Sequence, residues 1–218
     1  MRSRQRKGFC KMIAIIDYGV GNLFSLKSSF AAIGAEARVT ADEAEIRGAS
    51  RIILPGVGAF GDAAAKLRSS GLDRPLLDEA AHGKPVMGIC LGMQMLFDKS
   101  YEYGEHQGLG LLHGEVRPIS EVIPAGLKVP QMGWNALIFR KSSPLFKYIK
   151  EGDCAYFVHS YAAMGCDPVV TAVTEYGAEL TACVQAANVM GCQFHPEKSG
   201  TVGLNILRAF CELETGSC

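Results

Sequence analysis

The chain has 218 residues, of which 48% are hydrophobic, and it carries 22 Lys and Arg residues against 22 Asp and Glu residues. The formal net charge of zero at pH 7 provides no overall positive field for nucleic acid or an anionic membrane, so we expect small molecules or another protein as partners. The length and hydrophobic content suit one sizeable core.

The first eleven residues, MRSRQRKGFCK, are basic, and the apolar run that follows them is too short for the core of a signal peptide. We expect residues 1–11 to be a disordered extension and residues 12–218 to form a single domain. No apolar run approaches the ~20 residues that a membrane helix needs, which predicts that the protein does not enter a membrane.

Eight cysteines and five histidines are dispersed along the chain, without a C-x-x-C or H-x-x-x-H pair. Scattered cysteines are typical of reduced thiols in the cytoplasm, where disulfides are rare. Zinc sites need closely spaced ligands, so we expect no metal. We also expect no cofactor.

The first half of the chain alternates strand-like and helix-like segments. We expect strands at 12–16, 36–40 and 51–54. An apolar stripe predicts a helix from Leu23 to Ile33, with Asn22 as N-cap, and a second helix begins at Ala63. Strands that alternate with helices predict a parallel sheet covered on both faces.

The segment VMGICLGMQMLF, residues 86–97, begins like a buried strand and continues like a helix. Cys90 lies at the predicted corner, and Gly88 and Gly92 flank it in the pattern G-x-C-x-G, the cysteine counterpart of the serine nucleophile elbow. A buried, inert cysteine in a core strand is the alternative interpretation, because free cysteines are among the most buried residues.

The second half of the chain has short strand-like segments, which are LGLLHGEV, ALIFR, CAYFVHSY, PVVTAVTEY and LTACVQAANVMGCQF. We expect them to extend the sheet as mixed or antiparallel strands, followed by a closing helix over about 202–213. The predicted fold is therefore α/β, with a three-layer, open, mostly parallel sheet, helices on both faces and extra antiparallel strands.

The segment GCQFHPEKS, residues 191–199, supplies the groups that a cysteine nucleophile needs. His195 is a candidate base, and Glu197 is placed two residues further to hold the far ring nitrogen of that histidine. An ordinary polar turn after a strand would give the same three letters, His-Pro-Glu. His-Pro-Glu therefore indicates a catalytic pair only in combination with the elbow at Cys90.

The segment LPGVGAFGD, residues 54–62, is a glycine-rich loop. Its glycines allow the backbone N–H groups of Val57 and Gly58 to approach a substrate, and the N–H of Leu91 is a second donor, so together they predict an oxyanion hole. A phosphate cradle is the competing interpretation. However, GVGAFG lacks the Lys-Ser/Thr pair of a P-loop, and DYGVGNLF has Phe24 in place of the last glycine of a dinucleotide fingerprint.

Two sets of motifs carry a resemblance to a known family. GICLGMQ at 88–94, with HPE at 195–197, resembles the class I glutamine amidotransferases, whose glutaminase domain uses a Cys-His-Glu triad. DYGVGN, LPGVGAFGD, CLGMQMLF, VPQMGWN and YFVHSY are similar to one branch, the glutaminase subunits of imidazole glycerol phosphate synthase. The resemblance runs from about Met12 to Phe210, and it departs at Gln131, where many members have histidine.

The resemblance implies that Cys90, His195 and Glu197 are the triad and that glutamine is hydrolysed through a cysteine thioester. It further implies a substrate site and a partner-facing set. The substrate-site residues are Gly56, Gln94, Tyr156 and His159, and the partner-facing residues are Asn22, Trp134 and Lys198. Gln94 on a helix surface and aromatic residues in a strand core are the structural alternatives.

Members of this branch pass ammonia to a cyclase subunit that makes imidazole glycerol phosphate in histidine biosynthesis. The chain is too short to contain the expected eight-stranded barrel, so the resemblance implies a heterodimer with a separate cyclase. Three alternatives remain: the glutaminase of another amidotransferase, a cysteine hydrolase, and a non-catalytic module on the same fold.

Overall fold

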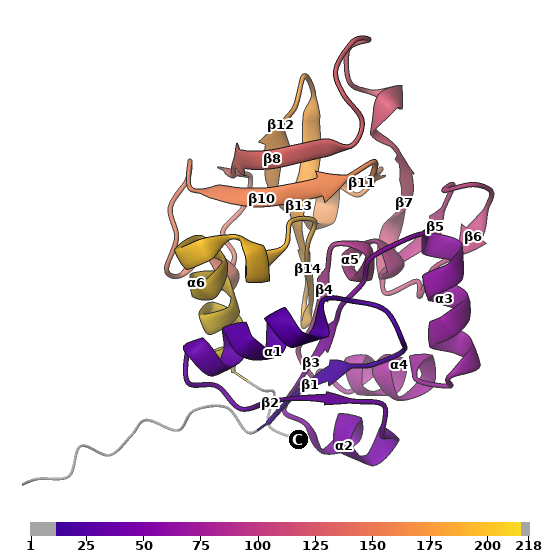
Figure 1. The fold of residues 1–218 in the computed structure, drawn as a ribbon, viewed down its shortest axis with the longest axis vertical. Coiled ribbons are helices and arrows are strands. Elements are labelled where there is room, and N and C mark those ends of the chain that lie inside the picture. The colour runs from indigo at the N-terminus through magenta and orange to yellow at the C-terminus, as the bar shows by residue number, and fades with distance from the viewer. Residues whose placement is uncertain (1–11, 215–218) are drawn as a thin grey trace, which may run out of the picture.

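An eight-stranded sheet runs through the centre of the computed structural model, which describes residues 12–214 (Figure 1). The expected disordered extension at 1–11 lies outside the described residues. From β2 to β14 neighbouring strands are parallel, and from β14 to β9 they are antiparallel. In spatial order the strands are β2 (Ala37–Thr40), β1 (Ile13–Ile16), β3 (Arg51–Leu54), β4 (Val86–Ile89), β14 (Val189–Cys192), β13 (Glu179–Ala186), β12 (Val170–Glu175) and β9 (Ile138–Phe139).

Helices cover both faces of this sheet, as expected (Figure 1). In β1, Ile13 and Ile15 join the core under α1 (Leu23–Ala32) and α6 (Gly200–Cys211), whereas Ala14 and Ile16 join the core on the opposite face. All four side chains are buried, because a parallel sheet between two helical layers has no solvent face. The opposite layer contains α2 (Glu43–Gly48), α3 (Phe60–Ser69), α4 (Asp73–Ala81) and α5 (Leu91–Met95).

Three of the five segments of the second half, which contain β9, β12, β13 and β14, extend the central sheet as antiparallel strands, as expected. The other two, LGLLHGEV and CAYFVHSY, do not, which corrects the expectation. A separate four-stranded sheet has the order β11-β7-β5-β6, and β10 pairs with β8 in a two-stranded ribbon. Alternating side chains identify a strand but not its partner, which long-range packing decides. The bounds are β5 (Phe97–Ser100), β6 (His106–Gln107), β7 (Leu112–Pro118), β8 (Gln131–Ala136), β10 (Cys154–His159) and β11 (Tyr161–Met164), with short 3-10 turns at Ile119–Glu121, Pro144–Phe146, Asp167–Val169 and Pro196–Lys198.

Helix boundaries differ from the sequence-based prediction at two places that matter for the site. Helix α3 begins at Phe60, three residues earlier than expected, where the Glu102 carboxylate accepts the Phe60 N–H at 2.6 Å. A carboxylate at a helix N-terminus satisfies an N–H that has no partner within the helix. Helix α5 ends after five residues, so Phe97 belongs to β5 rather than to a helix.

Candidate active site

Cys90 lies at the corner between β4 and α5, as expected, and its φ of +54° is in the region that favours glycine. Its N–H donates to the carbonyl of Cys192 at 2.8 Å. Small neighbours make the tight corner possible: a Cβ at Gly92 would lie 1.9 Å from the Leu54 carbonyl oxygen, and one at Gly88 would lie 2.6 Å from the Cα of Met93. The elbow is therefore packed between β3 and its own helix.

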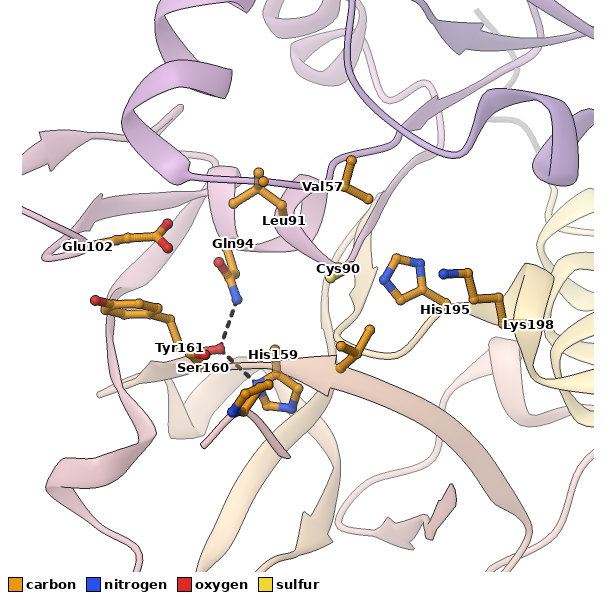
Figure 2. A pocket seen from close by; sticks show the side chains of 13 residues that line it. Val57, Cys90, Leu91, Gln94, Glu102, His159, Ser160, Tyr161, His195 and Lys198 are labelled. Atoms are coloured by element: carbon orange, nitrogen blue, oxygen red, sulfur yellow. Dashed lines mark hydrogen bonds between the residues drawn. The ribbon is translucent and has the colours of Figure 1, made fainter. Parts of the chain in front are cut away.

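His195 follows β14, the parallel neighbour of β4, so the two strand ends bring it to Cys90 (Figure 2). Its Nδ1 donates to Oε1 of Glu197 at 2.8 Å, and its backbone N–H donates to the carbonyl of Tyr156 at 3.0 Å. His195 is 3% exposed. The x-Pro-x spacing thus fixes the ring with Nε2 free for the sulfur, as the sequence predicts.

The electrostatics of this cluster favour a charged histidine. Burial by itself would lower the pKa of His195, but hydrogen bonds and charge interactions with Cys90 and Glu197 outweigh burial and raise the pKa to about 9. The groups that raise this pKa are the Cys90 sulfur and the Glu197 carboxylate, which lie against the ring. The arrangement therefore holds a charged imidazolium next to the Cys90 sulfur, with the Glu197 carboxylate on the other side of the ring.

The side chain of Glu197 is buried, and its two oxygens have different surroundings. Oε1 accepts from His195 and also from Nδ2 of Asn22 at 3.3 Å. Oε2 is buried and has no hydrogen-bond partner among the described residues. Asn22, which the resemblance assigns to the partner face, therefore reaches the candidate triad from the loop before α1.

A cavity of about 330 Å³ opens at Cys90, a volume suited to a small ligand (Figure 2). It collects eight of the residues expected from the sequence, namely Val57, Gly58, Cys90, Leu91, Gln94, His159, His195 and Lys198. The three residues predicted to supply the oxyanion-hole donors, Val57, Gly58 and Leu91, thus line the same cavity as Cys90. Gly58 has φ +91°, a conformation that suits glycine.

Besides Glu197 and Asn22, three of the expected residues do not line the cavity. Gly56 packs under the elbow, because a Cβ there would lie 2.6 Å from the Gly92 nitrogen and 2.9 Å from the Leu91 Cβ. Tyr156 and Trp134 are cross-strand neighbours on the outer face of the ribbon, with ring centroids 6.1 Å apart. None of the three lines the cavity, although Tyr156 contacts His195 through its carbonyl.

Gln94 and His159 meet at one backbone carbonyl. Nε2 of Gln94 and Nδ1 of His159 each lie 2.9 Å from the carbonyl oxygen of Tyr161 (Figure 2). A carbonyl only accepts, so His159 carries its proton on Nδ1. Burial, aided by the charge of His195, lowers the pKa of His159 to about 4, and the histidine is neutral at pH 7.

The cavity also contains residues that the sequence analysis missed, namely Glu102, Pro130, Val158, Ser160 and Tyr161. Glu102 is at the end of the cavity away from His195 (Figure 2). Burial raises the pKa of Glu102, although the Phe60 N–H opposes this effect. The surrounding letters, YEYGE, are typical of an exposed loop, so no local signal distinguishes this carboxylate.

Gln131, the position at which the family motif departs, is completely buried next to His159 in the ribbon register. Neither side-chain polar atom has a hydrogen-bond partner among the described residues. Across residues 12–214 no group of three or more His, Cys, Asp or Glu side chains is placed to hold a metal, and no helix is long and apolar enough to cross a membrane.

The fold and the site together define an α/β protein with a cysteine elbow and a histidine–carboxylate pair at adjacent strand ends. The family model described as "Glutamine amidotransferase class-I" matches residues 14–212. The chain belongs to this family.

Relatives at high identity cover nearly the whole chain. The protein named "Imidazole glycerol phosphate synthase subunit HisH" in Wolinella succinogenes is 46% identical over 204 residues, which are 93% of this chain and 100% of the relative. The protein of the same name in Methanothermobacter thermautotrophicus is 50% identical over 202 residues, covering 93% and 98%.

Solved structures support the fold at lower identity. The structure titled "Structure of PurLQS from Thermotoga maritima" aligns with a TM-score of 0.72 and 22% identity, covering 92% of this chain and 97% of that chain. A crystal structure titled as a glutamine amidotransferase gives a TM-score of 0.71 and 20% identity, with coverage of 91% and 97%. These two comparisons concern the fold alone.

Proposed function

We propose that this chain is the glutaminase subunit of imidazole glycerol phosphate synthase, with residues 12–218 forming one glutaminase domain. It hydrolyses glutamine to glutamate and ammonia in the cytoplasm and passes the ammonia to a separate cyclase subunit in histidine biosynthesis. The observation that carries the proposal is the placement of His195 between Cys90 and Glu197 at the bottom of the cavity. The names of relatives that are 46–50% identical support the choice of branch.

The first half-reaction acylates the cysteine. The Cys90 thiolate attacks the side-chain amide carbon of glutamine, a C–S bond forms, and the carbonyl oxygen becomes an oxyanion. The N–H groups of Leu91 and of Val57 or Gly58 stabilise this charge. Collapse of the intermediate breaks the C–N bond, His195 donates its proton to the departing nitrogen, and ammonia leaves a glutamyl thioester.

The second half-reaction releases glutamate. His195, now neutral, takes a proton from water, and the hydroxide attacks the thioester carbon. The C–S bond breaks, and the Cys90 thiolate is restored beside an imidazolium. Glu197 holds the ring through Nδ1 in both steps, so the same nitrogen, Nε2, releases and accepts the proton.

The other end of the cavity suits the amino-acid end of glutamine. Glu102 is a carboxylate there, and the carbonyl oxygen of Gln94 is left for a ligand because its amide nitrogen donates to Tyr161 and to Gln193. Both groups accept hydrogen bonds, so they favour the α-ammonium group over the α-carboxylate. We therefore propose that the side-chain carbonyl oxygen of Gln94 accepts a hydrogen bond from the α-ammonium group of the substrate.

Exposed apolar side chains near the cavity fit a docking surface for the cyclase subunit. Met132 and Trp134 on the outer face of β8 are 62% and 56% exposed, and Phe24 and Val57 are also exposed. Val57 lines the cavity, and Met132 is the cross-strand neighbour of Val158, which also lines it. Exposed apolar side chains beside a ligand cavity are typical of an interface. We propose that this face, with Asn22 and Lys198, meets the cyclase and keeps ammonia from bulk water.

Steady-state ammonia release tests the proposal. We expect low activity for the chain alone and a strong rise when the cyclase and its nucleotide ligand are present. Cys90→Ala and His195→Ala should remove nearly all turnover, and Glu197→Gln should lower it by on the order of 10²–10⁴. Cys154→Ala, which changes an exposed cysteine away from the cavity, is the matched control.

The alternatives give different results in the same assay. The glutaminase of another amidotransferase would release ammonia from glutamine but would not respond to this cyclase. A non-catalytic module would release none. Full activity that persists in folded Cys90→Ala would refute the assignment of the nucleophile.

A further inference from the structure

A buried hydrogen-bond chain connects the backbone carbonyl of Tyr161 to the sulfur of Cys90. Nε2 of Gln94 donates to the Tyr161 oxygen at 2.9 Å and to Oε1 of Gln193 at 3.0 Å. Nε2 of Gln193 then donates to Sγ of Cys90 at 3.7 Å. Gln193 is 0% exposed, and Gln94 is also buried. The sequence analysis assigned no role to Gln193.

The Tyr161 carbonyl fixes which groups donate and which accept in this series of hydrogen bonds. Because the Tyr161 carbonyl only accepts, the amide nitrogen of Gln94 must face it. The second hydrogen of the same nitrogen can only meet an acceptor, so Gln193 presents Oε1 to Gln94 and Nε2 to Cys90. Reversing the Gln193 amide would place two donor nitrogens against each other in a buried site, which is costly.

The local backbone explains why Gln193 reaches the sulfur. Residues two apart in an extended segment point to the same side, so Gln193 and His195 project together at the end of β14. Phe194, between them, packs in the core under α6. One short segment therefore delivers a neutral amide donor and a charged imidazole to the same atom.

We propose that Gln193 is a positioning residue for the nucleophile: it donates an N–H to the Cys90 thiolate, and the Gln94–Tyr161 contacts keep that N–H pointing at the sulfur. A hydrogen bond to a charged acceptor is stronger than one to a neutral acceptor, so the contact favours the thiolate form and limits where the sulfur can move. The inference rests on the proposed function only in assigning Cys90 as the nucleophile.

Alkylation of Cys90 by iodoacetamide tests the contact without requiring turnover. In Gln193→Met, which keeps the side-chain length but removes both polar atoms, the rate on the acidic side of the alkylation pH profile should fall about tenfold, because one charge-assisted hydrogen bond is lost. The pH at which the rate reaches half its maximum should rise by about one unit. Peptide mapping assigns the label to Cys90.

Gln131→Met is the matched control. Gln131 is another completely buried glutamine, but it has no hydrogen-bond partner among the described residues. The same substitution there should change neither the alkylation rate nor its pH midpoint by more than about twofold or a few tenths of a unit, within the spread of neutral changes. A fall of equal size in both variants would indicate general loosening and would overturn the proposal.

Turnover separates this inference from the proposed function. With the cyclase and its ligand present, Gln193→Met should lower kcat for glutamine by on the order of 10-fold or more, as expected for a group that acts on the nucleophile. Unchanged alkylation and unchanged kcat in folded Gln193→Met would overturn the role of Gln193. A wild-type chain that alkylates readily but never releases ammonia would refute the proposed function alone.

A measurement on the wild-type chain covers the case in which Gln193→Met does not fold. In ¹⁵N-labelled protein, capping the Cys90 sulfur removes the acceptor, so the side-chain amide protons of Gln193 should shift strongly and those of Gln131 should not. Equal or absent shifts in the two glutamines would refute the hydrogen bond to sulfur.

Discussion

Gly92 is the point at which the cysteine elbow touches the end of β3, and Gly92→Ala tests whether this packing positions Cys90. A Cβ at Gly92 would lie 1.9 Å from the Leu54 carbonyl oxygen and 2.8 Å from its carbon, whereas carbon–oxygen contacts need about 3.3 Å. The obstructing atoms are backbone, so the elbow or the strand end must move by roughly 1 Å or more. We expect the free energy of unfolding to fall by about 3 kcal/mol, the upper end for overpacked cores.

The same displacement should also lower the rate of glutamine hydrolysis, because moving a nucleophile by about 1 Å costs on the order of 10²-fold in rate. Urea unfolding followed by circular dichroism measures the first effect, and cyclase-stimulated ammonia release measures the second. Gly48→Ala, at the end of α2, is the control, since a Cβ there meets no described atom within 4 Å. A Gly92→Ala protein with wild-type unfolding midpoint and activity would refute the packing argument.

Three further predictions concern the titration of His195, the titration of His159, and the hydrogen bond from Tyr18 to the Pro55 carbonyl. The pKa of His195 is raised from 6.5 to about 9, so the stability that its charged form contributes is complete below pH 6.5 and is lost as the pH rises through 9. His195→Ala should therefore make the free energy of unfolding less dependent on pH between about 6.5 and 9. The pKa of His159 is lowered to about 4, so its contribution is complete above pH 6.5 and lost as pH falls through 4; His159→Gln should reduce the acid-side slope, and an unchanged slope would contradict the assignment. Tyr18→Phe removes the hydrogen bond from the Tyr18 hydroxyl to the Pro55 carbonyl at 2.7 Å and should cost about 1 kcal/mol in urea unfolding, whereas Tyr103→Phe, at an exposed position, should cost nothing measurable.

The elbow at Cys90 and the contact between His195 and Glu197 could be predicted because their signals are local. Gly88 and Gly92 are required by atoms within the elbow and the adjacent strand end, and both lie two residues from Cys90. The contact between His195 and Glu197 depends only on a spacing of two across a proline. Such features are readable from a few consecutive letters, and the structure confirms their geometry.

Glu102 and Gln193 could not be predicted, because distant pairing gives them their surroundings. Glu102 follows β5, which belongs to the four-stranded sheet rather than to the central one. The position of β5 in that sheet brings the Glu102 carboxylate to the cavity and to Phe60. Gln193 is a single polar residue at the end of an apolar strand. Its partners, Gln94 and Cys90, are about a hundred residues away in sequence.

The contacts that form the elbow also limit how the glycine-rich loop at residues 54–62 can move. Gly56 is held against Leu91 and Gly92, and the Tyr18 hydroxyl holds the carbonyl just before it. At the other end the Phe60 N–H is held by the carboxylate of Glu102. These fixed points leave only residues 57–59 between them, and a Cβ at Gly58 would meet no described atom within 4 Å.

A segment of three residues between fixed ends cannot swing as a lid, but it can rotate a peptide plane where glycine permits both signs of φ. Such a rotation would turn a backbone N–H toward or away from the Cys90 sulfur without disturbing the core. Control by a bound partner therefore needs only contacts that distinguish two orientations of the Val57–Gly58 peptide, and Val57 is exposed at the proposed interface. Glu102 both lines the cavity and holds the start of α3, so a ligand bound at Glu102 would act on the same short segment from the opposite end.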